Sequence, residues 1–181
     1  SAGYLYRHEP NGVRKWGLWF DSALRGSPAI DHNGVIYVLE DGGALHAVSD
    51  QGEKGKLLWS YKDGNMQLVL RDDGLYAMGR LSESKKFDPL TGKVLADLKC
   101  FRGNCTRATG TIDSIFARGY RHTGTMRFDI SYGKPRRLPG MRPACQDGVI
   151  VANGQLYWGP WMCDCNHSLV GVISLTGAGD F

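Results

Sequence analysis

The sequence contains no long hydrophobic run. A membrane-spanning helix needs about 20 consecutive, mostly apolar residues, and every apolar stretch of this chain is interrupted well before that length. The first residues turn polar at Arg7 and His8, which excludes the hydrophobic segment of a secretory signal at this position. We therefore expect no membrane span, and an exported form of the protein would be a mature or trimmed one.

The sequence also lacks the local signatures of several enzyme classes. It has no glycine-rich phosphate loop, no Ser-His-Asp arrangement with a local motif, and no pair of carboxylates at a spacing that stands out. Apolar residues do not recur every three or four positions, so no helix of any length is expected. Catalytic residues are therefore unassigned, and the sequence leaves open whether the protein is an enzyme.

Glycine is abundant, with 25 in 181 positions against an average of about 7%. Short apolar segments separated by glycine turns carry an aromatic residue at intervals of about 40 residues, the period expected of propeller blades. These aromatic residues are Tyr37, Tyr76, Phe116 and Tyr157. Turn glycines keep almost the same interval, at Gly12, Gly52, Gly92, Gly133 and Gly177. The two series together predict an all-β chain of repeated small sheets.

We predict a single β-propeller domain or propeller fragment, built from four-stranded antiparallel blades. About four blades fit in the chain, over residues 27–64, 65–104, 105–143 and 144–181, and residues 1–26 complete a blade as its last two strands. Two arrangements remain open. The chain closes a four-bladed ring, or it forms half of an eight-bladed ring that is completed by a second copy or by the remainder of a longer chain.

Two motifs carry a resemblance to a known family. The segment Asp88-Pro89-Leu90-Thr91-Gly92, and the series Gly34, Tyr37, Gly43 and Trp59, resemble the repeat of pyrroloquinoline-quinone-like β-propellers. The second half is similar to a cysteine-bearing segment of large bacterial proteins of this type. The resemblance implies the propeller fold but no particular activity, because that superfamily includes quinoprotein dehydrogenases and also cofactor-free scaffolds of outer-membrane assembly.

The resemblance also sets expectations about cofactors. Quinone-binding members usually carry an adjacent Cys-Cys pair over the cofactor, and this sequence has no adjacent cysteines. It also lacks the Cys-x-x-Cys-His motif that attaches haem covalently. We therefore expect neither quinone nor covalent haem, and no cofactor in the leading interpretation.

Five cysteines lie in the second half of the chain. Cys105 and Cys145 are one repeat apart, and Cys163 and Cys165 fall in one hairpin, so their four sulfurs are expected to meet near the junction of blades three and four. One interpretation is two disulfides, typical of an exported protein, with Cys100 left as a free thiol or paired with Cys105. The other is a site for zinc or another transition metal formed by the same four cysteines, with His167 as an alternative ligand. A catalytic thiol beside His167 is a third possibility.

The basic residues are unevenly distributed. Between Lys99 and Arg142 there are ten basic residues and two acidic ones, whereas the rest of the chain is net negative. Such asymmetry favours a surface that attracts anions, although a solvated face balanced by neighbouring blades is the alternative. The residues predicted to form this surface are Arg118, Arg121, Arg127, Arg136 and Arg137. Trp158 and Trp161, with Tyr157, form an aromatic shelf for sugar rings, or else Tyr157 and one of the two tryptophans belong to the core between blades.

These observations lead to two hypotheses about function. The first is a non-enzymatic propeller module, periplasmic or extracellular, that binds a protein partner or an anionic ligand such as acidic polysaccharide. Nucleic acid fits this hypothesis less well, because the cysteine pattern is typical of an exported protein. The alternative is a metal-dependent enzyme or redox subunit that uses the cysteine cluster.

Overall fold

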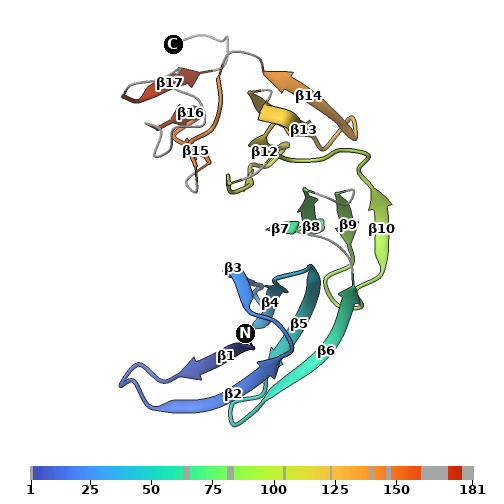
Figure 1. The fold of residues 1–181 in the computed structure, drawn as a ribbon, viewed down its shortest axis with the longest axis vertical. Coiled ribbons are helices and arrows are strands. Elements are labelled where there is room, and N and C mark those ends of the chain that lie inside the picture. The colour runs from blue at the N-terminus through green and yellow to red at the C-terminus, as the bar shows by residue number, and fades with distance from the viewer. Residues whose placement is uncertain are drawn as a thin grey trace. The chain divides into compact units, whose positions relative to one another are not determined.

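The computed structural model describes residues 2–62, 66–80, 84–103, 105–122, 124–138, 141–145, 148–159 and 171–176. Throughout this part of the chain the elements are antiparallel strands, apart from one short 3₁₀ turn, η1 (Tyr120–His122) (Figure 1). Within the same residues no helix is long and apolar enough to cross a membrane. Contacts divide the chain into two compact units, unit 1 (Ser1–Asp97) and unit 2 (Leu98–Phe181).

Unit 1 contains three sheets, in each of which neighbouring strands follow one another in the sequence. The first has two strands, β1 (Gly3–His8) and β2 (Arg14–Phe20). The second has four, namely β3 (Leu24–Ile30), β4 (Val35–Glu40), β5 (Ala44–Asp50) and β6 (Gly55–Lys62). The third also has four, namely β7 (Met66–Arg71), β8 (Gly74–Gly79), β9 (Lys85–Phe87) and β10 (Val94–Asp97).

Unit 2 contains two sheets with the same up-and-down order. The four-stranded sheet consists of β11 (Thr109–Gly110), β12 (Ser114–Arg118), β13 (Thr125–Asp129) and β14 (Lys134–Leu138). The last sheet has three described strands, β15 (Val149–Ala152), β16 (Gln155–Trp158) and β17 (Ile173–Thr176). The predicted all-β architecture of four-stranded antiparallel sheets is thus confirmed. The blade boundaries and the closure of a ring stay predictions.

The aromatic series has a common structural position. Each member is the third residue in the second strand of its sheet, in β4, β8, β12 or β16. Tyr37, Tyr76 and Phe116 are buried, whereas Tyr157 is half-buried. The tyrosine hydroxyl of Tyr37 donates to Asp31 Oδ2 at 3.0 Å, and that of Tyr76 to Asp73 Oδ2 at 2.6 Å. The 40-residue period therefore records one repeated core position.

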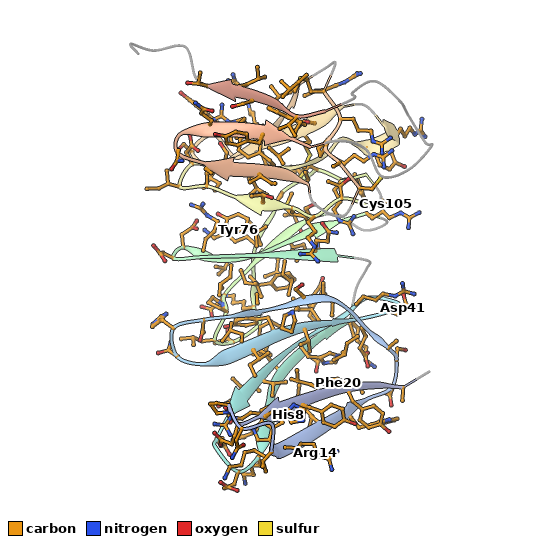
Figure 2. The ribbon with its side chains drawn as sticks, turned by 90° about the vertical axis from the view of Figure 1, so that its left-hand side faces the viewer. His8, Arg14, Phe20, Asp41, Tyr76 and Cys105 are labelled. Carbon is orange, nitrogen blue, oxygen red and sulfur yellow. The ribbon has the colours of Figure 1, made fainter. Side chains whose placement is uncertain are left out.

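The sheets of unit 1 pack face to face. Alternate residues of β4 point to opposite sides, so Tyr37 packs with Leu75 and Phe87 of the third sheet. Val38 packs on the other side with Leu5 and residues of β2. Phe20 lies between the β1–β2 sheet and the β3–β6 sheet (Figure 2). Each β-sheet in this unit is therefore stabilised mainly by apolar area shared with its neighbour.

One tryptophan contact occurs twice in unit 1. The Trp16 indole Nε1 donates to Asp50 Oδ1 at 2.9 Å, and its ring lies against Gly55. The Trp59 Nε1 donates to the carbonyl oxygen of Pro89 at 3.0 Å, and its ring lies against Gly92. In both cases the tryptophan of a final strand packs on the turn between the last two strands of the next sheet. The β1–β2 pair therefore corresponds to β5–β6.

Candidate functional site

Three arginines of unit 2 lie in the interior. Arg118 is 0% exposed, and Arg102 and Arg142 are also buried. An isolated bridge pairs Arg102 with Gly119, and the Gly103 amide donates to the Arg118 carbonyl oxygen at 2.7 Å. Arg118 therefore lies inside unit 2 and not on the exposed surface where the sequence analysis placed it.

The buried arginines are close to two cysteines. Arg142 Nη2 donates to Cys145 Sγ at 3.0 Å. Burial lowers the pKa of Arg118, the nearby charge of Arg142 lowers it further, and Cys145 and Cys105 act in the opposite direction. The interior of unit 2 thus contains buried arginine side chains close to the Cys145 thiol.

Arg127 has its charge balanced by neighbours. Its Nε donates to Ser114 Oγ at 2.7 Å, and its Nη2 lies 3.2 Å from Asp113 Oδ2 and 3.3 Å from Asp129 Oδ2. Arg127, Ser114 and Asp113 line one side of a groove of about 480 Å³ between the two sheets of unit 2, with Phe116 among the apolar residues of its wall. Because two carboxylates balance the charge of this guanidinium, the groove is not expected to bind an anion.

The remaining predicted arginines gather around a different pocket. It has a volume of about 340 Å³ and lies between the segment 99–101 and strands β13 and β14. Its lining residues are Lys99, Cys100, Phe101, Gly119, Tyr120, Met126, Pro135, Arg136 and Arg137. The set contains three cationic residues and no carboxylate. We call it the basic pocket.

Two aromatic rings form part of the wall of the basic pocket. The ring centres of Phe101 and Tyr120 are 5.7 Å apart, and the Arg121 guanidinium lies 5.6 Å from the centre of the Tyr120 ring. Arg121 therefore adjoins the pocket, as an exposed residue beside Tyr120. The structure thus brings together Arg121, Arg136 and Arg137 from the predicted surface.

Sequence reasoning missed Lys99, Phe101 and Tyr120 as pocket residues. Lys99 and Arg121 have φ values of 50° and 52°, in the left-handed region that residues other than glycine rarely adopt. Such conformations often accompany functional sites, but they have no signature in the sequence. The one available signal was the position of Lys99 at the start of the basic region.

Trp158 belongs to the core. It is 1% exposed, packs with Phe116 and Val149, and donates from Nε1 to Thr125 Oγ1 at 2.9 Å. An indole buried in this way has no face available to stack on a sugar, so the core alternative applies to Trp158. Trp161 lies outside the described residues.

The structure describes three of the five cysteines. Cys105 is exposed (Figure 2), whereas Cys100 and Cys145 are buried. Among these three described cysteines no disulfide joins any pair, so the Cys100–Cys105 bond considered above is absent. The described ranges contain no group of three or more residues able to hold a metal ion. Cys163, Cys165 and His167 lie outside those ranges, so the four-sulfur disulfide and metal interpretations stay predictions.

His46 in unit 1 is a buried, hydrogen-bonded histidine. Its Nδ1 lies 2.8 Å from Ser60 Oγ on the neighbouring strand. Its Nε2 lies 3.3 Å from Glu40 Oε2, an ion-pair distance without hydrogen-bond alignment. The Phe20 ring covers the imidazole at 4.9 Å between centres. We interpret this group as a structural link between strands β4, β5 and β6.

Comparison with solved structures identifies the fold. The crystal structure of BamB from Moraxella catarrhalis matches this chain with a TM-score of 0.62, covering 83% of this chain and 50% of that one. The chain has a β-propeller fold. The identity over the match is 13%, so the similarity concerns the fold alone. This chain corresponds to about half the length of the BamB chain, and neither a family model nor a curated protein matches its sequence.

Proposed function

We propose that this chain is an exported propeller module that binds an anionic ligand, with acidic polysaccharide as the ligand class, in the basic pocket of unit 2. The observation that carries the proposal is the pocket lining, in which Lys99, Arg136 and Arg137 occur with two aromatic rings and without a carboxylate. Export to the periplasm or cell exterior is supported by the family resemblance and by the cysteine content of the sequence.

The chemistry of an acidic sugar matches this lining. Guanidinium and ammonium groups form charge-assisted hydrogen bonds with carboxylates, which are stronger than neutral ones. The flat apolar faces of Phe101 and Tyr120 suit the C–H face of a sugar ring. The volume of about 340 Å³ lies near the lower end of the range for small-ligand sites. A short segment of a uronic acid polymer combines the charge and the ring that these residues require.

Calorimetric titration with oligogalacturonate tests the proposal. We expect binding that weakens as salt is added, because part of the affinity is electrostatic. A neutral cello-oligosaccharide of equal length is expected to bind at least tenfold more weakly. The double variant Arg136→Ser/Arg137→Ser is expected to lose binding, since it removes two of the three cationic groups of the lining.

A matched control separates local chemistry from overall charge. Lys54 and Lys56 are exposed residues of unit 1, and Lys54→Ser/Lys56→Ser removes the same net charge without changing the basic pocket. This variant is expected to bind as the wild type does. If both double variants lose affinity equally, the effect is non-specific charge attraction. If neither does, the basic pocket is not the binding site.

A further inference from the structure

The outer face of the β1–β2 sheet is aromatic and exposed. Tyr4, Tyr6 and Trp19 are 54%, 44% and 54% exposed. Tyr4 is the cross-strand partner of Trp19, and the parallel rings of Tyr4 and Tyr6 lie 5.6 Å apart. Arg14 lies against the Tyr6 ring on the side of the sheet that faces away from β3–β6 (Figure 2). Exposed aromatic groups of this kind mark interaction sites.

The repeated tryptophan contact shows what covers the equivalent face elsewhere. The cross-strand partner of Trp16 is Arg7, and that of Trp59 is Ala47. The residues that precede these partners, Tyr6 in β1 and His46 in β5, therefore occupy equivalent positions in their sheets. His46 is 9% exposed because Phe20 of the preceding sheet lies against it. The exposed position of Tyr6 is therefore one that a preceding propeller sheet covers when such a sheet is present.

Unit 2 presents the complementary kind of face. On the β15–β17 sheet, Tyr157 is half-buried and its cross-strand partner Ile150 is 51% exposed. The equivalent of Tyr157 in unit 1, Tyr37, is fully buried beneath the following sheet. The opposite side of β15–β17, which carries Trp158, packs against Phe116. The face with Ile150 and Tyr157 is therefore one that a following propeller sheet covers.

We propose that a second copy of this chain binds to the aromatic face of β1–β2 through its own β15–β17 sheet. The contact would continue the packing that already joins consecutive sheets within each unit, with an apolar face on each side. A second copy supplies both faces, so the same contact is available to each chain. The similar BamB chain is about twice as long as the matched region, so two copies would supply a propeller of comparable length.

The proposed contact is head-to-tail, because two different surfaces meet in it. This property distinguishes it from a symmetric contact between two β1–β2 faces. A variant with one damaged face still has the other face intact. Two variants damaged at different faces are therefore expected to associate with each other although neither associates with itself.

Light scattering and sedimentation of the full chain over a range of concentrations test the proposal. The wild type is expected to associate into a species of twice the chain mass. Tyr6→Ser/Trp19→Ser and Ile150→Glu, each alone, are expected to raise the dissociation constant at least tenfold. An equimolar mixture of the two is expected to restore much of the association. Tyr132→Ser, at an exposed residue of unit 2 outside both faces, serves as the control and leaves association unchanged.

Three results would overturn the proposal. The first is a wild type that stays monomeric at all concentrations, a result that needs no variant. The second is normal association of Ile150→Glu with loss in the Tyr6/Trp19 variant, which indicates a symmetric contact. The third is the absence of recovery in the mixture when circular dichroism shows that both variants are folded. The milder changes Trp19→Ser and Ile150→Ser replace any variant that does not fold.

Discussion

The two units of this propeller chain bury different kinds of side chain. Nine polar or charged side chains are buried among the described residues, and only His46 and Ser84 belong to unit 1. The other seven, including three arginines, lie in unit 2. The described residues other than glycine with positive φ also fall entirely in unit 2, at Lys99, Cys105, Arg121 and Asn153.

This difference indicates where specific chemistry resides. Unit 1 repeats one packing scheme, in which apolar faces and a tryptophan contact join each sheet to the next. Burial of polar groups and strained backbone in unit 2 opposes stability unless neighbouring groups compensate. Features of this kind concentrate at functional sites, and the basic pocket lies in the same unit. This contrast supports the proposal that ligand recognition occurs in unit 2, with unit 1 as the regular scaffold.

The largest effect is expected from removal of the tryptophan contact in unit 1. Trp59→Ala removes the ring that packs on Gly92 and the hydrogen bond to Pro89. We expect the free energy of unfolding to fall by about 3 kcal/mol, measured by urea denaturation. Hydrogen exchange is expected to quicken in the strands of unit 1.

Trp19→Ala is the matched control, because it removes the same side chain from an exposed position of unit 1. In dilute solution its unfolding free energy is expected to stay within about 0.5 kcal/mol of the wild type. Equal effects of the two substitutions would show that the repeated tryptophan contact does not stabilise the sheets.

The second prediction concerns the polar interior of unit 2. Arg142→Ala removes a buried guanidinium that donates to Cys145 Sγ. Because loss of one member of a buried polar group leaves its partners uncompensated, we expect a decrease of about 2–3 kcal/mol in the free energy of unfolding. Arg136→Ala, at an exposed position of the same unit, is expected to have little effect. A stable Arg142 variant would mean that the buried arginines do not support the fold of unit 2.

The third prediction compares one substitution in both units. Trp158→Phe removes the indole N–H that donates to the buried Thr125 Oγ1 at 2.9 Å. Trp59→Phe removes a half-buried hydrogen bond that water can replace. We expect decreases in unfolding free energy of about 1.5 kcal/mol for Trp158→Phe and about 0.5 kcal/mol for Trp59→Phe. The reverse order in thermal or urea unfolding would contradict the view that unit 2 depends more on buried polar contacts.

The sequence predicted the regular part of the molecule well. The spacing of Tyr37, Tyr76 and Phe116 located the second strand of three sheets, because the same core position recurs in each repeat. Glycine turns and alternating apolar residues are local signals, and they report strands whatever the surroundings. That residues 1–26 complete a blade stays a prediction.

The sequence could not predict which basic residues enter the interior. Arginine is mostly exposed in proteins, so Arg118 was grouped with Arg136 although only Arg136 is exposed. Burial of Arg118 depends on residues distant in the sequence, such as Gly103, whose amide donates to the Arg118 carbonyl oxygen. The basic pocket likewise requires segments near Lys99 and Arg136 to meet. Tertiary packing decides both, and no local pattern encodes it.

The fourth prediction concerns a surface carboxylate of unit 1. Burial alone would raise the pKa of Asp73, but hydrogen bonds from Lys86, Tyr76 and Arg71 outweigh it and lower the pKa to about 2. The carboxylate therefore stabilises the folded state above its ordinary pKa of 3.8, and this contribution is lost as the pH falls through about 2. Because the Asp73 side chain is 39% exposed, we expect it to contribute only about 1 kcal/mol to the free energy of unfolding.

Asp73→Asn should reduce the change in unfolding free energy between about pH 4 and pH 2 by that amount. The control Asp72→Asn, at a neighbouring exposed residue, should leave that change as it is in the wild type. Equal pH profiles for Asp73→Asn and the wild type would mean that these ion pairs do not stabilise unit 1, which would leave its apolar contacts as the principal source of its stability.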